Sequence, residues 1–304
     1  MKLIIQPDDG LTPLLQAVKR ARQSIDIVIF RFDRPELEKA LAAAVTRGVV
    51  VRALIAHTNR GGEKNLRKLE TRLLGCGVTV ARTADDLTRY HSKMMVADDV
   101  LHVFGFNFTR LDIERSRSFG LITKDKRLVK EACALFTADV TRQPYTPSHD
   151  RFVVSPETSR QLLGKFIRDA RKQLLIYNVK VSDRLMLRLL QERVKAGVEV
   201  RLIGKLDKRI EGIETRKLAD LRLHVRAIIR DGQAVFIGSQ SLRKLELDGR
   251  REVGLIAADR RIAAKVQSVF EADWKESAPA ADAKPRDSDA KSEAPARAAL
   301  SVVR

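Results

Sequence analysis

Aromatic residues and cysteines are scarce in this chain of 304 residues. Only 5% of the residues are Phe, Trp or Tyr, so the core must be mainly aliphatic, and few rings are available to stack on single-stranded bases. Two cysteines, Cys76 and Cys133, are too few for a cysteine-based metal cluster or a disulfide framework. We therefore expect a reducing compartment, no metal site and no cofactor.

Long apolar runs are also missing. The sequence contains no apolar stretch of about 18 residues or more, so it predicts no transmembrane segment. The first residues, MKLIIQPDDG, combine a short apolar run with acidic residues, unlike a secretory signal peptide. We expect a soluble, cytoplasmic protein that charge alone can hold at a membrane surface.

Positive charge is present in excess. Lys and Arg number 58 against 39 Asp and Glu, which gives a net charge of +19. A field of this size attracts anions, so an anionic phospholipid surface and nucleic acid are both compatible partners. A basic surface that is merely solvated is the alternative that charge alone leaves open.

The chain contains an internal repeat. ARQSIDIVIF, from Ala21, resembles ARKQLLIYNV, from Ala170, and TRGVVVRALI, from Thr46, resembles KAGVEVRLIG, from Lys195, at the same offset of 149 residues. Each copy predicts a buried strand, a helix that ends at a glycine, and a second strand. Such β–α–β units favour an α/β protein of two repeated halves, each with a mainly parallel sheet flanked by helices.

We place the first half at residues 1–150 and the second at residues 151–275. Residues 276–304 are rich in Ala, Pro, Ser, Lys and Asp and show no sustained apolar period, so we expect a disordered tail. The first copy carries 16 extra residues around 63–78, which predict a longer helix and its exit.

A second repeated pattern contains side chains suited to catalysis. HSKMMVADDV and HVRAIIRDGQ each place a basic residue two positions after a histidine and an aspartate seven positions after it, and a glycine follows at the same distance in both copies. These residues are His91, Lys93, Asp98 and Gly105 in the first copy, and His224, Arg226, Asp231 and Gly238 in the second.

The pattern predicts two hairpins that present the histidines. Alternate residues of a strand share a face, so His91 and Lys93 should point to the same side. Asp98 and Asp231 begin turn dipeptides, which places them at the strand end, where they support the site better than they contact a substrate. If the halves pack about a pseudo-twofold axis, the two histidines meet in one pocket.

Two histidines on opposite sides of a phosphorus atom suit in-line displacement. One attacks phosphorus to form a phosphohistidine, and the other protonates the leaving oxygen and then activates water or an alcohol. Lys93 and Arg226 would neutralise the phosphoryl oxygens. A single histidine on an apolar strand is more often a core residue, so we assign no role to the others, which are His57, His102 and His149.

These paired motifs resemble the phospholipase D superfamily, whose mark is two copies of His-x-Lys-x-x-x-x-Asp, commonly followed by Gly-Ser-x-Asn. The resemblance covers roughly residues 1–275. It implies two α/β sandwich halves, one active site shared at their interface, and a phosphohistidine intermediate. The superfamily includes phospholipases, cardiolipin and phosphatidylserine synthases, and some nucleases. The resemblance implies catalytic roles for His91, Lys93, Asp98, His224, Arg226, Asp231 and Glu252.

The first copy departs from the family pattern after its hairpin. It has GFNFT from Gly105, so it lacks the serine and keeps Asn107. Ser118 stands near the place of the glutamate that helps to orient a histidine in this family.

The second copy departs differently. It keeps Ser239 and Glu252, but has Ser241 where asparagine is usual and Arg226 in place of the lysine. We expect Asn107 and Ser239 to bind substrate and Glu252 to orient His224. We also expect His91 to be the nucleophile and His224 the acid and base.

Three functions are compatible with these features. The favoured one is a metal-independent phosphodiesterase of phospholipase D type that hydrolyses or transfers phosphatidyl groups at an anionic membrane surface. A nuclease of the same superfamily fits the charge equally well. The third is an inactive protein that binds phosphate or nucleic acid, to which the change to Arg226 would point. Water and an alcohol compete for one intermediate, so both hydrolysis and transfer stay open.

Overall fold

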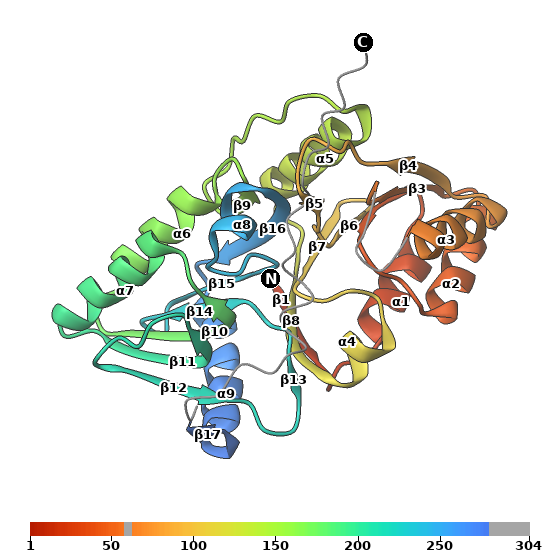
Figure 1. Ribbon diagram of the computed structural model, residues 1–304. Coiled ribbons are helices and arrows are strands. Elements are labelled where there is room, and N and C mark those ends of the chain that lie inside the picture. Colours follow the sequence, from red (N-terminus) through yellow and green to blue (C-terminus); the bar gives the residue numbers. More distant parts are fainter. Residues whose placement is uncertain (58–62, 280–304) are drawn as a thin grey trace, which may run out of the picture.

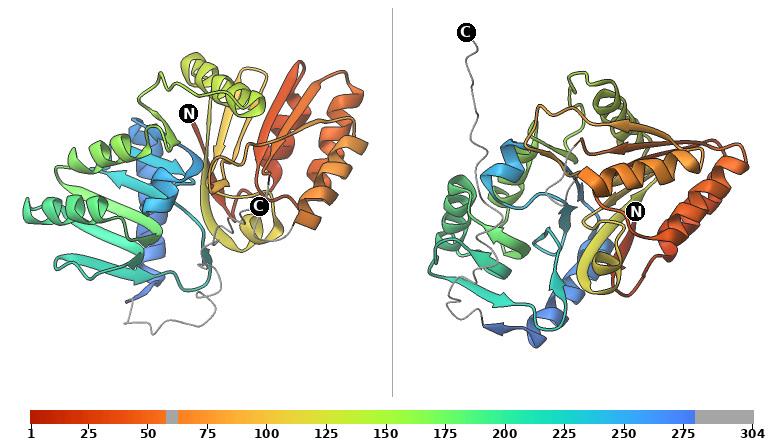
Figure 2. Two further views of the ribbon diagram at one scale, coloured as in Figure 1. Left: turned by 45° about the horizontal axis from the view of Figure 1, so that its top comes forward. Right: turned by 45° about the vertical axis from the view of Figure 1, so that its right-hand side comes forward.

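Two α/β halves lie side by side in the computed structural model, which describes residues 1–57 and 63–279 (Figure 1). The expected pair of α/β halves is confirmed. Each half has one sheet, and each sheet has helices on its outer face, so that the two helical layers lie on opposite sides of the molecule (Figure 2).

The first sheet carries the first motif. Its strand order is β1 (Lys2–Gln6), β8 (Ser116–Thr123), β7 (Val100–Phe104), β6 (Met94–Ala97), β2 (Ser24–Ile29), β3 (Val50–Ile55) and β4 (Thr79–Arg82). Its outer face packs against α1 (Thr12–Arg20), α2 (Pro35–Thr46) and α3 (Glu63–Gly75). The helix expected from the extra residues of the first copy is therefore present, as α3.

The second sheet carries the second motif. Its strand order is β17 (Ala278–Pro279), β12 (Ile213–Lys217), β11 (Glu199–Leu206), β10 (Gln173–Val181), β14 (Ala227–Arg230), β15 (Ala234–Gly238) and β16 (Arg250–Ala257), and β9 (Phe152–Ser155) also pairs with β16. Its outer face packs against α6 (Ser159–Arg168) and α7 (Arg184–Lys195). A shared core between the sheets contains residues of both halves together with α5 (Lys126–Thr141) and α9 (Arg260–Glu276).

Both sheets are mixed, which corrects the expectation of mainly parallel sheets. Parallel pairing joins β2, β3 and β4 in one half and β10, β11 and β12 in the other, as the β–α–β repeats predict. The strands of each motif pair antiparallel with each other and with their neighbours β2 or β10. The reason is that tight turns can join only antiparallel strands.

The two motif hairpins differ by one residue in their turns. Two residues separate Ala97 from its partner Val100, whereas three separate Arg230 from Ala234. The repeat therefore shifts by one position after the turn, and Gly105 is not the counterpart of Gly238.

Backbone contacts identify the true counterparts. The N–H of Gly105 donates to Phe119 and that of Ser239 donates to Val253, the equivalent residue of the second half. Gly105 thus occupies the position of Ser239. A Cβ at Gly105 would lie 3.0 Å from the Ser118 hydroxyl and 3.3 Å from the Gly238 carbonyl oxygen, so the crowded interface explains the missing serine.

The halves exchange short strands. β5 (Arg89–Tyr90), which leads into the first motif, pairs with β16 of the second half. β13 (Arg222–Leu223), which leads into the second motif, pairs with β8 of the first half. Each histidine is therefore delivered to the edge of the opposite sheet.

Two equivalent buried ion pairs hold this arrangement. Arg117 of β8 contacts Asp273 of α9 at 2.9 Å, and Arg251 of β16 contacts Asp139 of α5 at 3.1 Å. Both pairs join one half to the other, and each arginine also donates a hydrogen bond to a backbone carbonyl, that of Gln6 or of Ser155. Because a broken buried pair leaves an uncompensated charge, these contacts favour a single relative placement of the halves.

The predicted disordered tail begins too early. Ser277 donates a hydrogen bond to the Asp273 carbonyl, and residues 278–279 form β17 against β12. The second half therefore extends to residue 279, and residues 280–304 of the predicted tail lie outside the described residues. In the parts of the chain that the structure describes, no helix is long and apolar enough to cross a membrane.

Candidate active site

His91 lies between β5 and β6 rather than within a strand, which corrects its expected position. Its backbone N–H donates to the Arg251 carbonyl at 2.8 Å. Its ring packs edge-on against Phe30, with centroids 4.8 Å apart, and Nδ1 lies 3.0 Å from both carboxylate oxygens of Glu252. The side chain is thus fixed from two sides.

Lys93 lies beneath this histidine and is completely buried. Its Nζ donates to the His91 carbonyl at 2.7 Å and lies 3.0 Å from His91 Nε2. The two side chains therefore share a face, as predicted. Burial lowers the pKa of Lys93 to about 7.

The protonation of His91 follows from its partners. Burial, with Lys93 as the next contribution, holds the pKa of His91 well below its usual value. The neutral ring donates from Nδ1 to Glu252, because a carboxylate accepts and cannot donate. Nε2 then carries the lone pair, which faces Lys93 Nζ at 3.0 Å and can act as a nucleophile once Lys93 turns to a phosphoryl oxygen.

The partner of His224 is Asp112, a residue that the sequence analysis missed. Asp112 lies on α4 (Arg110–Glu114), and its Oδ2 is 3.6 Å from His224 Nδ1, an ion-pair distance that is too long for a direct hydrogen bond. His224 Nδ1 has no hydrogen-bond partner among the described residues. The prediction that Glu252 orients His224 is wrong, because the exchange of β5 places Glu252 beside His91.

Asp112 is itself held firmly. It accepts hydrogen bonds from the backbone and side-chain N–H groups of Asn107, at 2.8 and 2.7 Å, and from Arg222 at 2.7 Å. Burial raises the pKa of Asp112, but His224, Asn107 and Arg222 together outweigh burial and lower it. A carboxylate is therefore maintained next to His224.

A sequence signal for Asp112 does exist. RLDIE of α4 and KLELD of α8 (Lys244–Asp248) occupy equivalent places after the two hairpins, and Asp112 corresponds there to Glu246. Both acids are buried. Ser118, which stands near the place of the family glutamate, does not take this role. It is buried, and its hydroxyl has no hydrogen-bond partner in the described structure.

Arg226 adopts the place of Lys93 in the second half. Its guanidinium donates to the His224 carbonyl at 3.0 Å, as Lys93 does to His91, and to Ser241 at 3.2 Å. Burial lowers the pKa of Arg226. The arginine therefore keeps the cationic position despite its different shape.

Asn107 and Ser239, which we expected to bind substrate, make hydrogen bonds within the protein. The Asn107 amide nitrogen is taken up by Asp112, whereas its Oδ1 has no partner among the described residues. The Ser239 hydroxyl donates to the Val253 carbonyl at 3.3 Å and accepts the Val253 N–H at 3.2 Å. It also lowers the pKa of Glu252, which burial raises.

Asp98 and Asp231 lie at the far ends of the motif strands, five residues or about 16 Å of extended chain away from the basic residues. Asp98 accepts the backbone N–H groups of residues 22–24 at 2.8–3.0 Å, and Asp231 accepts those of residues 171–173 at 2.7–3.1 Å. Their side chains support the fold, and the expectation of a direct catalytic role is not supported by this position.

We expect Asp98→Ala to lower the free energy of unfolding by about 3 kcal/mol, because three backbone donors lose their acceptor. Asp98 also has φ of +52°, a conformation that alanine tolerates poorly. Urea denaturation measures the loss, with the exposed neighbour Asp99→Ala as the matched control. Equal stability of the two variants would contradict this structural role.

The two motifs form one site. Burial is the main cause that lowers the pKa of both histidines, and the cation of the opposite half adds to it: Arg226 acts on His91, and Lys93 acts on His224. His91 and His224 are 8% and 6% exposed, so both side chains are buried. No cluster of three or more His, Cys, Asp or Glu side chains suited to a metal occurs in residues 1–57 and 63–279.

Known proteins resemble this chain in sequence and in fold. The family model described as "Cardiolipin synthase, PLD-like domain" matches residues 14–140 and 163–274. Human mitochondrial cardiolipin hydrolase is 30% identical over 127 residues, which are 40% of this chain and 48% of that protein. The chain spans about half the length of the curated relatives it matches.

Two solved structures match nearly the whole chain. Polyphosphate kinase from Porphyromonas gingivalis has a TM-score of 0.74 at 19% identity, over 90% of this chain and 50% of that one. Phosphatidylserine synthase from Haemophilus influenzae Rd KW20 has a TM-score of 0.68 at 11% identity, over 90% of this chain and 85% of that one. At these identities the likeness shows the fold alone. With the family model covering most of both halves, the chain belongs to the cardiolipin synthase, PLD-like domain family of the phospholipase D superfamily.

Proposed function

We propose that the protein is a phosphodiesterase of phospholipase D type that hydrolyses or transfers phosphatidyl groups. The observation that carries the proposal is the reciprocal pairing of the two motifs. Each histidine has a carboxylate from the opposite half at Nδ1 and a cation two residues along, completely buried in Lys93 and half-buried in Arg226. Nε2 is then the ring atom left for phosphorus chemistry in both histidines, and in His91 it must first part from Lys93 Nζ.

The reaction would proceed in two displacements. His91 Nε2 attacks phosphorus, so that an N–P bond forms and the bond to the leaving oxygen breaks. His224 donates a proton to that oxygen, and for this step it must be protonated, a form that Asp112 and the bound phosphodiester anion favour. In the second step His224 takes a proton from water or an alcohol, whose oxygen attacks phosphorus and releases His91. Lys93 and Arg226 stabilise the charge on the remaining phosphoryl oxygens.

Phospholipid is the proposed substrate class. The family description and the name of the human relative both concern cardiolipin. The charge of +19 would hold the protein at an anionic membrane surface. The same charge supports a nuclease as the second candidate, since phosphate neutralisation dominates affinity for nucleic acid.

Turnover of bis(p-nitrophenyl) phosphate in the presence of EDTA tests the proposal. We expect release of p-nitrophenol by the wild type and its loss in His91→Ala and His224→Ala, with His149→Ala, outside the site, as the control. Equal rates in all four proteins would refute the two-histidine mechanism. Phosphatidylglycerol and plasmid DNA then separate the lipid substrate from the nucleic-acid alternative.

The rate should fall as the pH rises through about 7. Lys93 must carry its proton to stabilise the phosphoryl oxygens, and burial lowers its pKa to about 7, so the active form is lost on the alkaline side. Arginine keeps its proton throughout this range. The Lys93→Arg variant should therefore keep its rate to higher pH than the wild type. An alkaline limb of the pH–rate profile that does not move in this variant would contradict the assignment of that limb to Lys93.

A further inference from the structure

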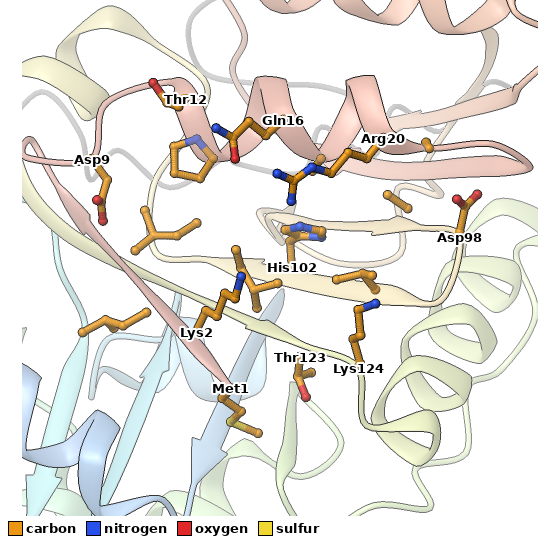
Figure 3. Close-up of a pocket in the computed structure, with 18 of the residues that line it drawn as sticks. Met1, Lys2, Asp9, Thr12, Gln16, Arg20, Asp98, His102, Thr123 and Lys124 are labelled. Carbon is orange, nitrogen blue, oxygen red and sulfur yellow. The ribbon is translucent and has the colours of Figure 1, made fainter.

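We propose that a cavity on the outer face of the first sheet binds a phosphomonoester with an apolar substituent, separately from the histidine motifs. The cavity has a volume of about 960 Å³ and lies between α1 and the strands β1, β7 and β8 (Figure 3). Its lining includes Asp98 at the turn end of β6, whereas His91 and Lys93 precede the other end of that strand.

The floor of the cavity carries a buried imidazole. His102 of β7 is 3% exposed, projects into the cavity, and has no hydrogen-bond partner for Nδ1 in the described structure (Figure 3). Burial lowers the pKa of His102 to about 4, so the ring is neutral at pH 7 and keeps one N–H donor and one acceptor. An unpaired buried polar atom is costly, and a polar ligand that reached the ring would relieve that cost.

Three cations surround this ring. Lys2 of β1, Arg20 at the end of α1 and Lys124 in the loop after β8 are exposed and direct their charged ends toward the space beside His102 (Figure 3). None of the three has an ion-pair partner among the described residues. Their convergence on a neutral donor suits a ligand group with several anionic oxygens.

The acidic residues of the lining are mostly occupied. Asp98 accepts three backbone N–H groups, Asp9 accepts the N–H of Ile5, and Asp8 lies 3.8 Å from Arg117. Asp99 is exposed. These carboxylates keep their charge, so the lining as a whole is close to neutral. The positive charge is local to His102, because Lys2, Arg20 and Lys124 point toward it, whereas Asp9 and Asp98 stand at opposite ends of the cavity (Figure 3).

The remaining side chains of the lining indicate that the substituent on the phosphate is apolar. Apolar side chains from α1, β1, β7 and β8 line it, namely Leu3, Ile4, Pro13, Ala17, Val100 and Ile122. The volume is at the upper end of the usual range for sites that bury a small ligand. A phosphomonoester carries close to two charges at pH 7 and three acceptor oxygens, which match the three cations better than a carboxylate does. An alkyl phosphate combines both requirements.

The test uses octyl phosphate below its micelle concentration, read at the imidazole nitrogens by NMR. The chain has five histidines, so His102 is assigned by the signal that His102→Asn removes. We expect octyl phosphate to shift that signal saturably and to bind at least tenfold more tightly than inorganic phosphate. Arg20→Gln with Lys124→Gln should weaken this binding by about tenfold or more.

The matched control removes the same charge outside the cavity. Lys19→Gln with Lys126→Gln changes exposed neighbours that do not line it, and should leave the affinity unchanged. A His102 signal that does not respond to octyl phosphate would overturn the proposal, as would equal weakening by both double variants. If inorganic phosphate bound as tightly as octyl phosphate, the proposed contact between an apolar substituent and the cavity would be overturned. The readout at His102 is independent of phosphodiesterase activity.

Discussion

Glu252→Gln is expected to lower kcat for phosphodiester cleavage by about a thousand- to ten-thousandfold, up to the loss seen when the carboxylate behind a catalytic histidine becomes an amide. Glu252 is completely buried and lies 3.0 Å from His91 Nδ1. The glutamine keeps the shape of the side chain, but it loses the charge that fixes the tautomer and stabilises the positive ring during phosphoryl transfer. Single-turnover kinetics measure the change, and thermal unfolding checks that the variant is folded.

Asp112→Asn is the matched comparison from the other half. Asp112 is 3.6 Å from His224 Nδ1 without a direct hydrogen bond, so we expect a smaller loss of about ten- to a hundredfold. A larger loss for Asp112→Asn than for Glu252→Gln would reverse this order and show that the longer contact tightens during catalysis.

His224→Asn is expected to trap the phosphoenzyme. With bis(p-nitrophenyl) phosphate the leaving group needs little help from an acid, so His91 should still form its N–P bond and release about one equivalent of p-nitrophenol. The second step lacks its base, and steady turnover should fall by about a thousandfold. Rapid mixing measures the burst, and ³¹P NMR detects the phosphohistidine.

His91→Asn provides the opposite arm of that experiment. No burst is expected, because the nucleophile is missing while the acid and base remain. A burst in His91→Asn and none in His224→Asn would assign the nucleophile to His224. The contact between His91 and Glu252, in the motif with the complete His-Lys-Asp pattern, supports the expected order.

Local patterns were sufficient for much of the fold. The β–α–β repeats were predictable because burial periodicity and helix-ending glycines depend on residues close together in the chain. The supporting position of Asp98 was also predictable, since a turn dipeptide follows the motif strand. The parallel sheets were overestimated because the repeat covers only part of each sheet, and the hairpins add antiparallel strands.

Small differences in turn length escaped the pattern. Gly105 and Gly238 match by spacing from their histidines, yet the longer turn of the second hairpin makes Gly105 equivalent to Ser239. Spacing along the sequence does not reveal that one turn is a residue longer than the other. The backbone hydrogen bonds of the strand after the turn reveal it directly.

The sequence by itself determined the two motifs, the paired histidines and the cations beside them, because each motif is a short segment whose side chains are positioned by one hairpin. Only the tertiary structure decided which carboxylate serves which histidine. β5 pairs with β16, and β13 with β8, so Glu252 reaches His91 while Asp112 lies beside His224. These pairings join segments more than 100 residues apart, and they depend on which sheet edges meet when the halves pack, which no local period encodes.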